Sequence, residues 1–374
     1  MIYLDNAATG GFKPRAVTDA VDTVTKFLCA NPGRSGHRLA ISGAKILVDC
    51  RNVVGQLFDS PVDNVIFTKN CTEALNVAIF GTLKVGGHVI TTIFEHNSVL
   101  RPLYHLAKQE LITLEVVSPT PDMPLEQVIE NAILPNTYLV VCTSVSNVTG
   151  EVLDLDKIGE VCKRYNILFL VDGAQGAGHI PISLKKQNIS MLAVAGHKGL
   201  YAPMGTGCLL FSENTHVSPL LFGGTGIETF STSQPQTYPE KLEAGTLNLP
   251  GIAGLLEGAT YVKNNLNYIG KQLLSITKDI IDELNDVKKV KCYSKPNPAG
   301  IVAFEFSNLT SSEATDLFNA EHDIALRGGF HCAPLMHKYL NTDSNGLVRA
   351  SFAVQNSSRE LSSFIRAVQI LAKK

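Results

Sequence analysis

Short apolar runs alternate with amphipathic stretches from about residue 60 onward. Runs that are apolar along their whole length are typical of strands covered on both faces of a parallel sheet. The runs span 65–68, 88–92, 138–144, 167–172, 191–196 and 207–211, and the helical patterns between them span 72–82, 97–109, 124–133 and 154–165. The alternation predicts an α/β fold on a mostly parallel sheet.

A polar, glycine-rich stretch at 222–246 ends this alternation. A long helical pattern near 250–284 follows it and leads into a smaller C-terminal unit. The length of 374 residues fits two domains, because a domain typically holds about 150 residues.

Charge and hydropathy narrow the class of partner. The net charge is −2 and the basic residues are scattered, so neither a nucleic acid nor an anionic membrane surface is expected as a partner. The first residues show no basic segment followed by an apolar one, and no apolar run approaches the roughly 18 residues that span a bilayer. We therefore expect a cytoplasmic protein that acts on a small molecule.

The cysteines do not form a recognisable framework. No C-x-x-C pair occurs and most cysteines lie in apolar segments, which disfavours a disulfide scaffold and a zinc site. We expect no metal, and we expect seven of the eight cysteines to be small core residues. The eighth, Cys332, lies in a segment rich in Gly and Pro beside Arg327 and His331. The cysteine positions are 29, 50, 71, 142, 162, 208, 292 and 332.

Polar residues follow several of the apolar runs, at the ends where open α/β sheets bind ligands. A lysine there, Lys198, is suited to a lowered pKa and to Schiff-base formation, although a solvated lysine is the ordinary reading. Asp172 ends another run, where it could also cap a turn. Together they match pyridoxal phosphate, which needs a lysine for its aldehyde and an acid for its ring nitrogen. The other polar residues at these ends are Thr72, His96, Asn147 and His197.

These residues lie in motifs that resemble the class V aminotransferase family of fold type I pyridoxal-phosphate enzymes. The motifs are YLDNAAT (3–9), NCTEALN (70–76), EHNS (95–98), SNVTG (146–150), VDGAQ (171–175), AGHKG (195–199), EAGTLN (243–248), RGGFHCAP (327–334) and RASF (349–352). The resemblance implies a seven-stranded sheet in a large domain, 14–255, and a smaller α+β domain formed by 1–13 and 256–374. It also implies a homodimer with shared active sites.

The resemblance further implies roles for individual residues. Lys198 binds the cofactor aldehyde and moves the Cα proton, while Asp172 keeps the ring nitrogen protonated. His96 stacks on the ring, and Gln175 bonds the phenolic oxygen. The other implied cofactor ligands are Asn147 and, for the phosphate, Cys71, Thr72, His197 and, from the partner subunit, Thr246. Many relatives carry a serine two residues before the histidine, whereas this chain has Ala195, which removes one phosphate hydrogen bond.

The RGGFHCAP motif separates reactions within the family. A thiol beside cationic groups has a larger thiolate fraction, so Cys332 is suited to be a nucleophile. The short spacing resembles cysteine desulfurases of the selenocysteine-lyase-like subgroup, which move sulfur from L-cysteine onto such a cysteine as a persulfide. Arg349 then matches the residue that pairs with the substrate carboxylate, and we assign Asn147 and Arg327 to substrate binding as well.

Other interpretations stay open at this point. A selenocysteine lyase, a transaminase or another class V enzyme could use the same cofactor residues, with Cys332 incidental. A non-catalytic sulfur-assembly scaffold is disfavoured, because a scaffold does not need Lys198, Asp172 and Cys332 together. A physiological sulfur acceptor, such as a protein, is expected but not identified. The loop at 31–40, with Arg34, His37 and Arg38, could border a neighbouring subunit's active site or be a solvated basic loop.

Overall fold

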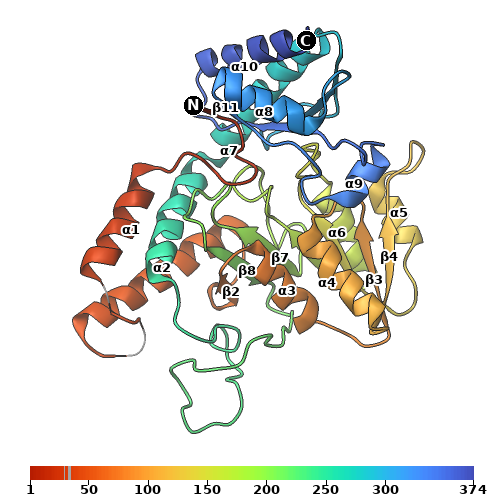
Figure 1. Ribbon diagram of the computed structural model, residues 1–374. Helices are drawn as coiled ribbons and strands as arrows, with labels where there is room; N and C mark the ends of the chain where they lie inside the picture. The colour runs from red at the N-terminus through yellow and green to blue at the C-terminus, as the bar shows by residue number, and fades with distance from the viewer. Residues whose placement is uncertain (29, 33–34) are drawn as a thin grey trace.

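A seven-stranded sheet forms the centre of the molecule (Figure 1). The computed structural model describes residues 1–28, 30–32 and 35–374. The strand order is β2-β8-β7-β6-β5-β3-β4; all neighbouring pairs are parallel except the two that involve β8. The α/β prediction with a mostly parallel sheet is therefore confirmed. The strands are β2 (Val65–Thr68), β3 (Gly87–Thr92), β4 (Ile112–Val117), β5 (Thr137–Thr143), β6 (Leu168–Asp172), β7 (Met191–Ala195) and β8 (Gly207–Phe211).

The edge strand β4 was not predicted. Its residues alternate between buried or half-buried and exposed positions, whereas β7 and β8 are buried throughout. An edge strand has one solvated side, so its sequence, ITLEVV, carries a glutamate within an apolar segment. The strand is therefore not a continuous apolar run, and the sequence pattern does not predict it.

Helices cover both faces of the sheet. Alternate residues of the central strands pack into two separate apolar clusters, as strand geometry requires. One face carries α3 (Cys71–Gly81) and α4 (Asn97–Lys108), and the other carries α2 (Arg38–Phe58), α6 (Leu155–Arg164) and α7 (Leu249–Asn285). The remaining helices of this part are α1 (Arg15–Phe27), which packs on α7, and α5 (Leu125–Asn131), with a short 3₁₀ turn at Val62–Asn64.

A second group of elements lies at the C-terminal end of α7 (Figure 1). It has an antiparallel sheet of β9 (Val290–Cys292), β10 (Ile301–Phe306) and β12 (Val348–Ser351). The N-terminal strand β1 (Ile2–Tyr3) pairs with β11 (Ile324–Ala325) in this region. The predicted domain boundary at 255 lies inside α7, and the division into domains stays a prediction. The helices are α8 (Ser311–His322), α9 (Pro334–Tyr339) and α10 (Ser358–Leu371).

Two of the sequence predictions concern residues that the structure does not describe, namely Cys29 as a core residue and Arg34 in the 31–40 loop. Of the other cysteines, all are free, with Cys292 and Cys332 half-buried and the remaining ones buried. Among the described residues, no helix is both long enough and apolar enough to cross a membrane.

Candidate active site

The polar residues at the strand ends come together in one pocket. It is formed where β5, β6 and β7 end and α3 and α4 begin. All the predicted cofactor ligands except Thr246 line it. The lining is Asn70, Cys71, Thr72, Leu75, His96, Ser98, Thr143, Asn147, Asp172, Ala174, Gln175, Ala195, His197 and Lys198.

Asp172 and Lys198 contribute a carboxyl group and an amine to this pocket. Burial lowers the pKa of Lys198, and Asp172 opposes this shift. The Asp172 carboxylate is buried, and its Oδ1 accepts the Ala174 N–H at 2.9 Å and the Cys71 thiol at 3.4 Å. Burial, followed by the field of Asp172, raises the pKa of Cys71, so this thiol stays protonated. Oδ2 has no hydrogen-bond partner within the described chain and remains available to a ligand.

His96 is held as the N-cap of α4. Its Nδ1 accepts the backbone N–H of Ser98 at 3.0 Å, so the ring proton of the neutral form lies on Nε2. Burial lowers the pKa of His96 to about 4, against the opposing effect of Asp172. The ring is therefore neutral near pH 7 and suited to stacking on another flat ring.

An anion-binding corner lies at the start of α3. The first N–H groups of a helix have no intrahelical acceptor, so those of Cys71 and Thr72 face a ligand position. The Thr72 and Ser98 hydroxyls lie 2.8 Å apart beside them, and Ser98 was not predicted as a site residue. Ala195 lines the same pocket and offers no side-chain donor.

Cys332 lies in a sharply turned segment that is attached to this pocket. His331 and Cys332 both have positive φ, at 47° and 58°, a conformation that side chains other than glycine rarely adopt. The Cys332 carbonyl accepts the Asn97 N–H at 2.7 Å, and the His331 carbonyl accepts the Asn147 amide at 2.7 Å. These bonds hold the cysteine segment against residues on either side of the pocket.

Arg349 connects the segment of Asn147 with the N-terminal segment. Its Nη1 donates to the Asn147 carbonyl at 2.9 Å and its Nη2 lies 3.1 Å from Asp5 Oδ1, while Nε is buried without a partner within the described chain. The backbones of Arg327 and Arg349 form an isolated antiparallel bridge. The positive charges of both arginines lower the pKa values of Lys198 and His96. No hydrogen bond of the Arg327 guanidinium is present among the described residues, so it is a free cation.

The N-terminal segment contributes contacts that the sequence analysis did not anticipate. Gln175 donates its amide to the Ala7 carbonyl at 2.9 Å, and His197 Nδ1 lies 3.1 Å from Thr9 Oγ1. Lys13 donates to the His197 carbonyl at 3.2 Å, and burial lowers the pKa of Lys13 to about 8. In the sequence, only the resemblance of the YLDNAAT motif to the family distinguishes this segment.

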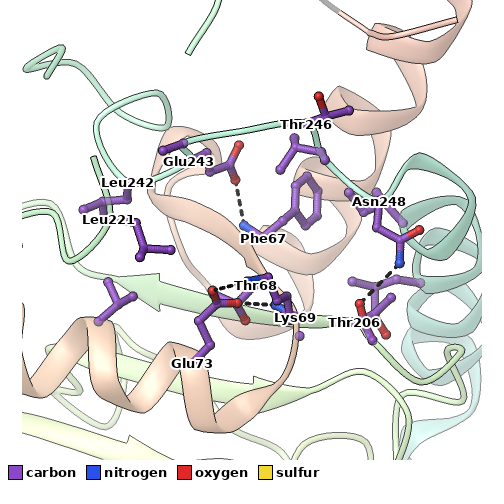
Figure 2. Close-up of a pocket in the computed structure, with 17 residues that line it drawn as sticks. Phe67, Thr68, Lys69, Glu73, Thr206, Leu221, Leu242, Glu243, Thr246 and Asn248 are labelled. Carbon is purple, nitrogen blue, oxygen red and sulfur yellow. Dashed lines mark hydrogen bonds and ion pairs between the residues drawn. The ribbon is translucent and has the colours of Figure 1, made fainter. Parts of the chain in front are cut away.

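Thr246 lies apart from the other cofactor ligands. It lines a second pocket with Thr68, Lys69 and Leu221, and Figure 2 shows it on the same segment as Glu243. Glu243 forms a bidentate ion pair with Arg51, at 2.9 and 2.6 Å, and accepts the Phe67 N–H at 2.7 Å. This buried pair attaches the Thr246 segment to α2 and β2.

Comparison with known proteins identifies the family. The model for aminotransferase class-V matches residues 2–364. The chain belongs to this family. Members of the family depend on pyridoxal phosphate, in agreement with the sequence prediction. The solved structures to which the fold is similar include cysteine desulfurases of fold type I.

Several relatives match this class V chain over nearly its full length. A probable cysteine desulfurase of Pyrococcus abyssi is 33% identical, over 100% of this chain and 94% of the relative. Cysteine desulfurase CsdA of Escherichia coli is 31% identical, over 98% and 93%. The apo structure of a cysteine desulfurase from Thermococcus onnurineus NA1 has a TM-score of 0.93 at 32% identity, covering 100% of this chain and 94% of the other.

The pocket fits the family's cofactor. It has an amine with a lowered pKa, a carboxylate with one uncommitted oxygen, a neutral imidazole and free N–H groups at a helix start. These are the groups that an aldehyde, a protonated ring nitrogen, a flat ring and a phosphate require. The Asn147 Oδ1 atom is also buried without a partner within the described chain, which leaves an acceptor for a ligand.

Proposed function

We propose that the chain is a pyridoxal-phosphate-dependent cysteine desulfurase that transfers sulfur from L-cysteine to its own Cys332. The observation that carries the proposal is the attachment of the Cys332 segment to the lysine pocket through Asn97 and Asn147. A cysteine that served only packing would not need to be half-buried in a segment with two successive positive φ angles. The names of the full-length relatives support the same reaction.

The cofactor residues take the following roles in this proposal. Pyridoxal phosphate, when bound, supplies the aldehyde that takes the substrate amine and the ring that withdraws electrons from Cα. Lys198 holds the aldehyde before substrate arrives and then accepts the Cα proton, because its lowered pKa leaves a larger fraction of free amine. Asp172 bonds the ring nitrogen, His96 covers the ring, and Gln175 donates to the phenolic oxygen. The start of α3, Thr72 and His197 hold the phosphate.

The sulfur-transfer step uses Cys332 and the arginines. Arg349 binds the substrate carboxylate, assisted by Asn147 and Arg327. The Cys332 sulfur attacks the substrate sulfur, so that an S–S bond forms and the substrate C–S bond breaks. The electron pair of the broken bond returns to the substrate carbon skeleton, which takes up protons and leaves as L-alanine. The net change is L-cysteine plus a thiol giving L-alanine plus a persulfide.

We infer that the functional unit is a homodimer. Thr246 lies outside its own cofactor pocket, in a pocket lined also by the half-exposed Leu221. Phe222 and Phe230, on the loop that precedes this segment, are 74% and 102% exposed. Large exposed apolar side chains grouped on one loop indicate an interface. In the dimer, Thr246 donates to the phosphate bound by the partner subunit.

A protein or small thiol must remove the persulfide sulfur to complete the cycle. Phe330, two residues before Cys332, is 48% exposed, and Cys332 itself is half-buried. The cysteine therefore lies near the surface, where an acceptor thiol reaches it without unfolding the segment.

Replacement of the nucleophile tests the proposal. Cys332→Ala should still bind pyridoxal phosphate and L-cysteine, but should lose sulfur transfer on the order of a hundredfold or more, because the attacking sulfur is absent. The measurements are alanine and sulfide release and mass spectrometry of the persulfide after a single turnover. Cys292→Ala, at the other half-buried cysteine, is the matched control.

The product pattern separates the alternatives. Alanine formation by Cys332→Ala at the unaltered rate, or a persulfide on another cysteine only, contradicts sulfur transfer to Cys332. A keto acid with aminated cofactor would indicate transamination. Activity confined to L-selenocysteine would indicate a selenocysteine lyase.

A further inference from the structure

Asp5 lies in the N-terminal segment, and its carboxylate contacts the arginine assigned to the substrate. We propose that Asp5 is a positioning residue that orients the Arg349 guanidinium for the carboxylate of the amino-acid substrate. This inference rests on the proposed function, because it concerns how that function binds its substrate. Nothing in the YLDNAAT motif by itself pointed to such a role.

The three guanidinium nitrogens of Arg349 have three different surroundings. Nη1 is bonded to the Asn147 carbonyl, Nη2 is bonded to Asp5, and Nε has no partner within the described chain. The side chain is only 1% exposed, so water does not satisfy Nε. A buried donor without an acceptor is costly unless a ligand supplies one, and a carboxylate on the Nε side would do so.

Arg349 also needs an anchor because its neighbours are cationic. Arg327 and Lys198 lie within electrostatic range of it and repel it. An arginine side chain has many rotamers, and two bonds from two different elements reduce this freedom. Asp5 is the anionic one of the two anchors, and it offsets part of the buried positive charge.

Asp5 is itself placed accurately with respect to the strand that carries Arg349. Residues 5 and 351 form a parallel bridge, in which the Ser351 N–H donates to the Leu4 carbonyl at 2.7 Å and the Asn6 N–H donates to the Ser351 carbonyl at 3.3 Å. Ser351 belongs to β12, two residues after Arg349. The aspartate and the arginine are therefore held on adjacent backbone segments.

A carboxylate bound to Arg349 has two conceivable roles. It can be an anchor that fixes the guanidinium, or a stand-in, meaning a group that occupies the position of the substrate carboxylate until substrate displaces it. Asp5 contacts Nη2 through one oxygen, and Nε stays uncommitted. An anchor leaves one side of the guanidinium free for substrate, whereas a stand-in would occupy that side. Because Nε has no partner within the described chain, the structure favours the role of Asp5 as an anchor.

The experiment compares Asp5→Ala with Asp5→Asn. Asparagine keeps an acceptor oxygen at the same place but removes the charge, and alanine removes both. Binding of 3-mercaptopropionate, which has the carboxylate and thiol but no amine, is measured by calorimetry on the cofactor-loaded protein. KM and kcat are measured for L-cysteine. Glu130→Gln, which removes the negative charge beside the surface residue Arg164, is the matched control.

For Asp5→Ala, we expect the Kd for 3-mercaptopropionate and the KM for L-cysteine to rise roughly tenfold or more, with a much smaller change in kcat. Asp5→Asn should recover part of this loss, because asparagine keeps the acceptor oxygen but not the charge that offsets the neighbouring cations. An unchanged or lower Kd in Asp5→Ala would overturn the inference, and so would equal losses in the two variants. Absence of alanine production by the unaltered protein would reject the proposed reaction instead, while the calorimetry would still decide the role of Asp5.

Discussion

Glu95 and His96 are adjacent in the chain, and burial acts on both in the same way, by favouring the neutral form. The pKa of His96 falls to about 4, while burial raises the pKa of Glu95 to about 8. Glu95 Oε1 accepts the Thr92 hydroxyl at 2.6 Å and the Thr143 N–H at 3.0 Å, and Oε2 has no partner within the described chain. Glu95 is thus a protonated acid near pH 7, and its hydrogen bonds join the end of β3 to Thr143, which lines the pocket.

The pH dependence of stability follows from this shift. The unfolded chain releases the Glu95 proton near pH 4.5, whereas the folded chain keeps it up to about pH 8. The contribution of Glu95 protonation to the free energy of unfolding is therefore fully present below pH 4.5 and is lost as the pH rises to 8. Glutamine resembles the protonated acid but does not titrate. The free energy of unfolding of Glu95→Gln, minus that of the unaltered protein, should therefore increase from pH 5 to pH 8.

Urea denaturation of the cofactor-free protein at both pH values measures this difference. Glu160→Gln, on the exposed side of α6, controls for the loss of a carboxylate. The interpretation fails if the Glu95→Gln difference is the same at pH 5 and pH 8.

At the scale of elements, the candidate active site depends on contacts between segments that are distant in sequence. The N-terminal segment contacts Gln175, His197 and Arg349, and the segment with Thr246 is attached to α2 through Arg51 and Glu243. Arg51 also lies over the Phe67 ring, 4.3 Å from its centroid. Both side chains of the ion pair are less than 10% exposed, so neither charge has water as an alternative partner.

Breaking this pair should therefore be costly. Arg51→Ala leaves Glu243 buried without its cation and should lower the free energy of unfolding by about 3 kcal/mol or more. It should also weaken cofactor retention, because the Thr246 segment loses its attachment. Lys26→Ala breaks an exposed pair with Asp22 and should change the free energy by less than about 0.5 kcal/mol. Similar effects of the two variants in chemical denaturation would contradict the structural role of Arg51.

At the scale of the whole molecule, the proposed homodimer leads to a prediction about the exposed loop that contains Phe222 and Phe230. Phe222→Asp combined with Phe230→Asp places two charges on the exposed apolar loop and should shift the protein from dimer to monomer. The physical reason is that burial of a carboxylate at an apolar interface without a partner is unfavourable. The monomer should also release pyridoxal phosphate more readily, because the partner's Thr246 is lost.

Sedimentation velocity and cofactor absorbance after gel filtration measure the two effects. Val85→Asp changes another exposed apolar residue, 74% exposed and just before β3, and should have neither effect. A double variant that stays dimeric would show that the interface lies elsewhere.

The sequence alone determined most of the sheet and the groups that line the pocket. Apolar runs covered on both faces have a distinct pattern, so β2, β3, β5, β6, β7 and β8 were predictable, and the polar residues after them necessarily gather at one edge. The edge strand β4 has a solvated side and lacked that pattern. The family motifs then supplied the roles that we propose for Lys198 and Asp172, which their spacing could only suggest.

Tertiary structure decided what no local pattern encodes. The ion pair of Asp5 with Arg349 joins residues 344 positions apart, and the bond from Asn147 to the His331 carbonyl spans 184 positions. Such contacts depend on how the chain returns to the sheet after α7. The lowered pKa of His96 and the raised pKa of Glu95 have the same origin, because burial is a property of the packed molecule and not of the residue.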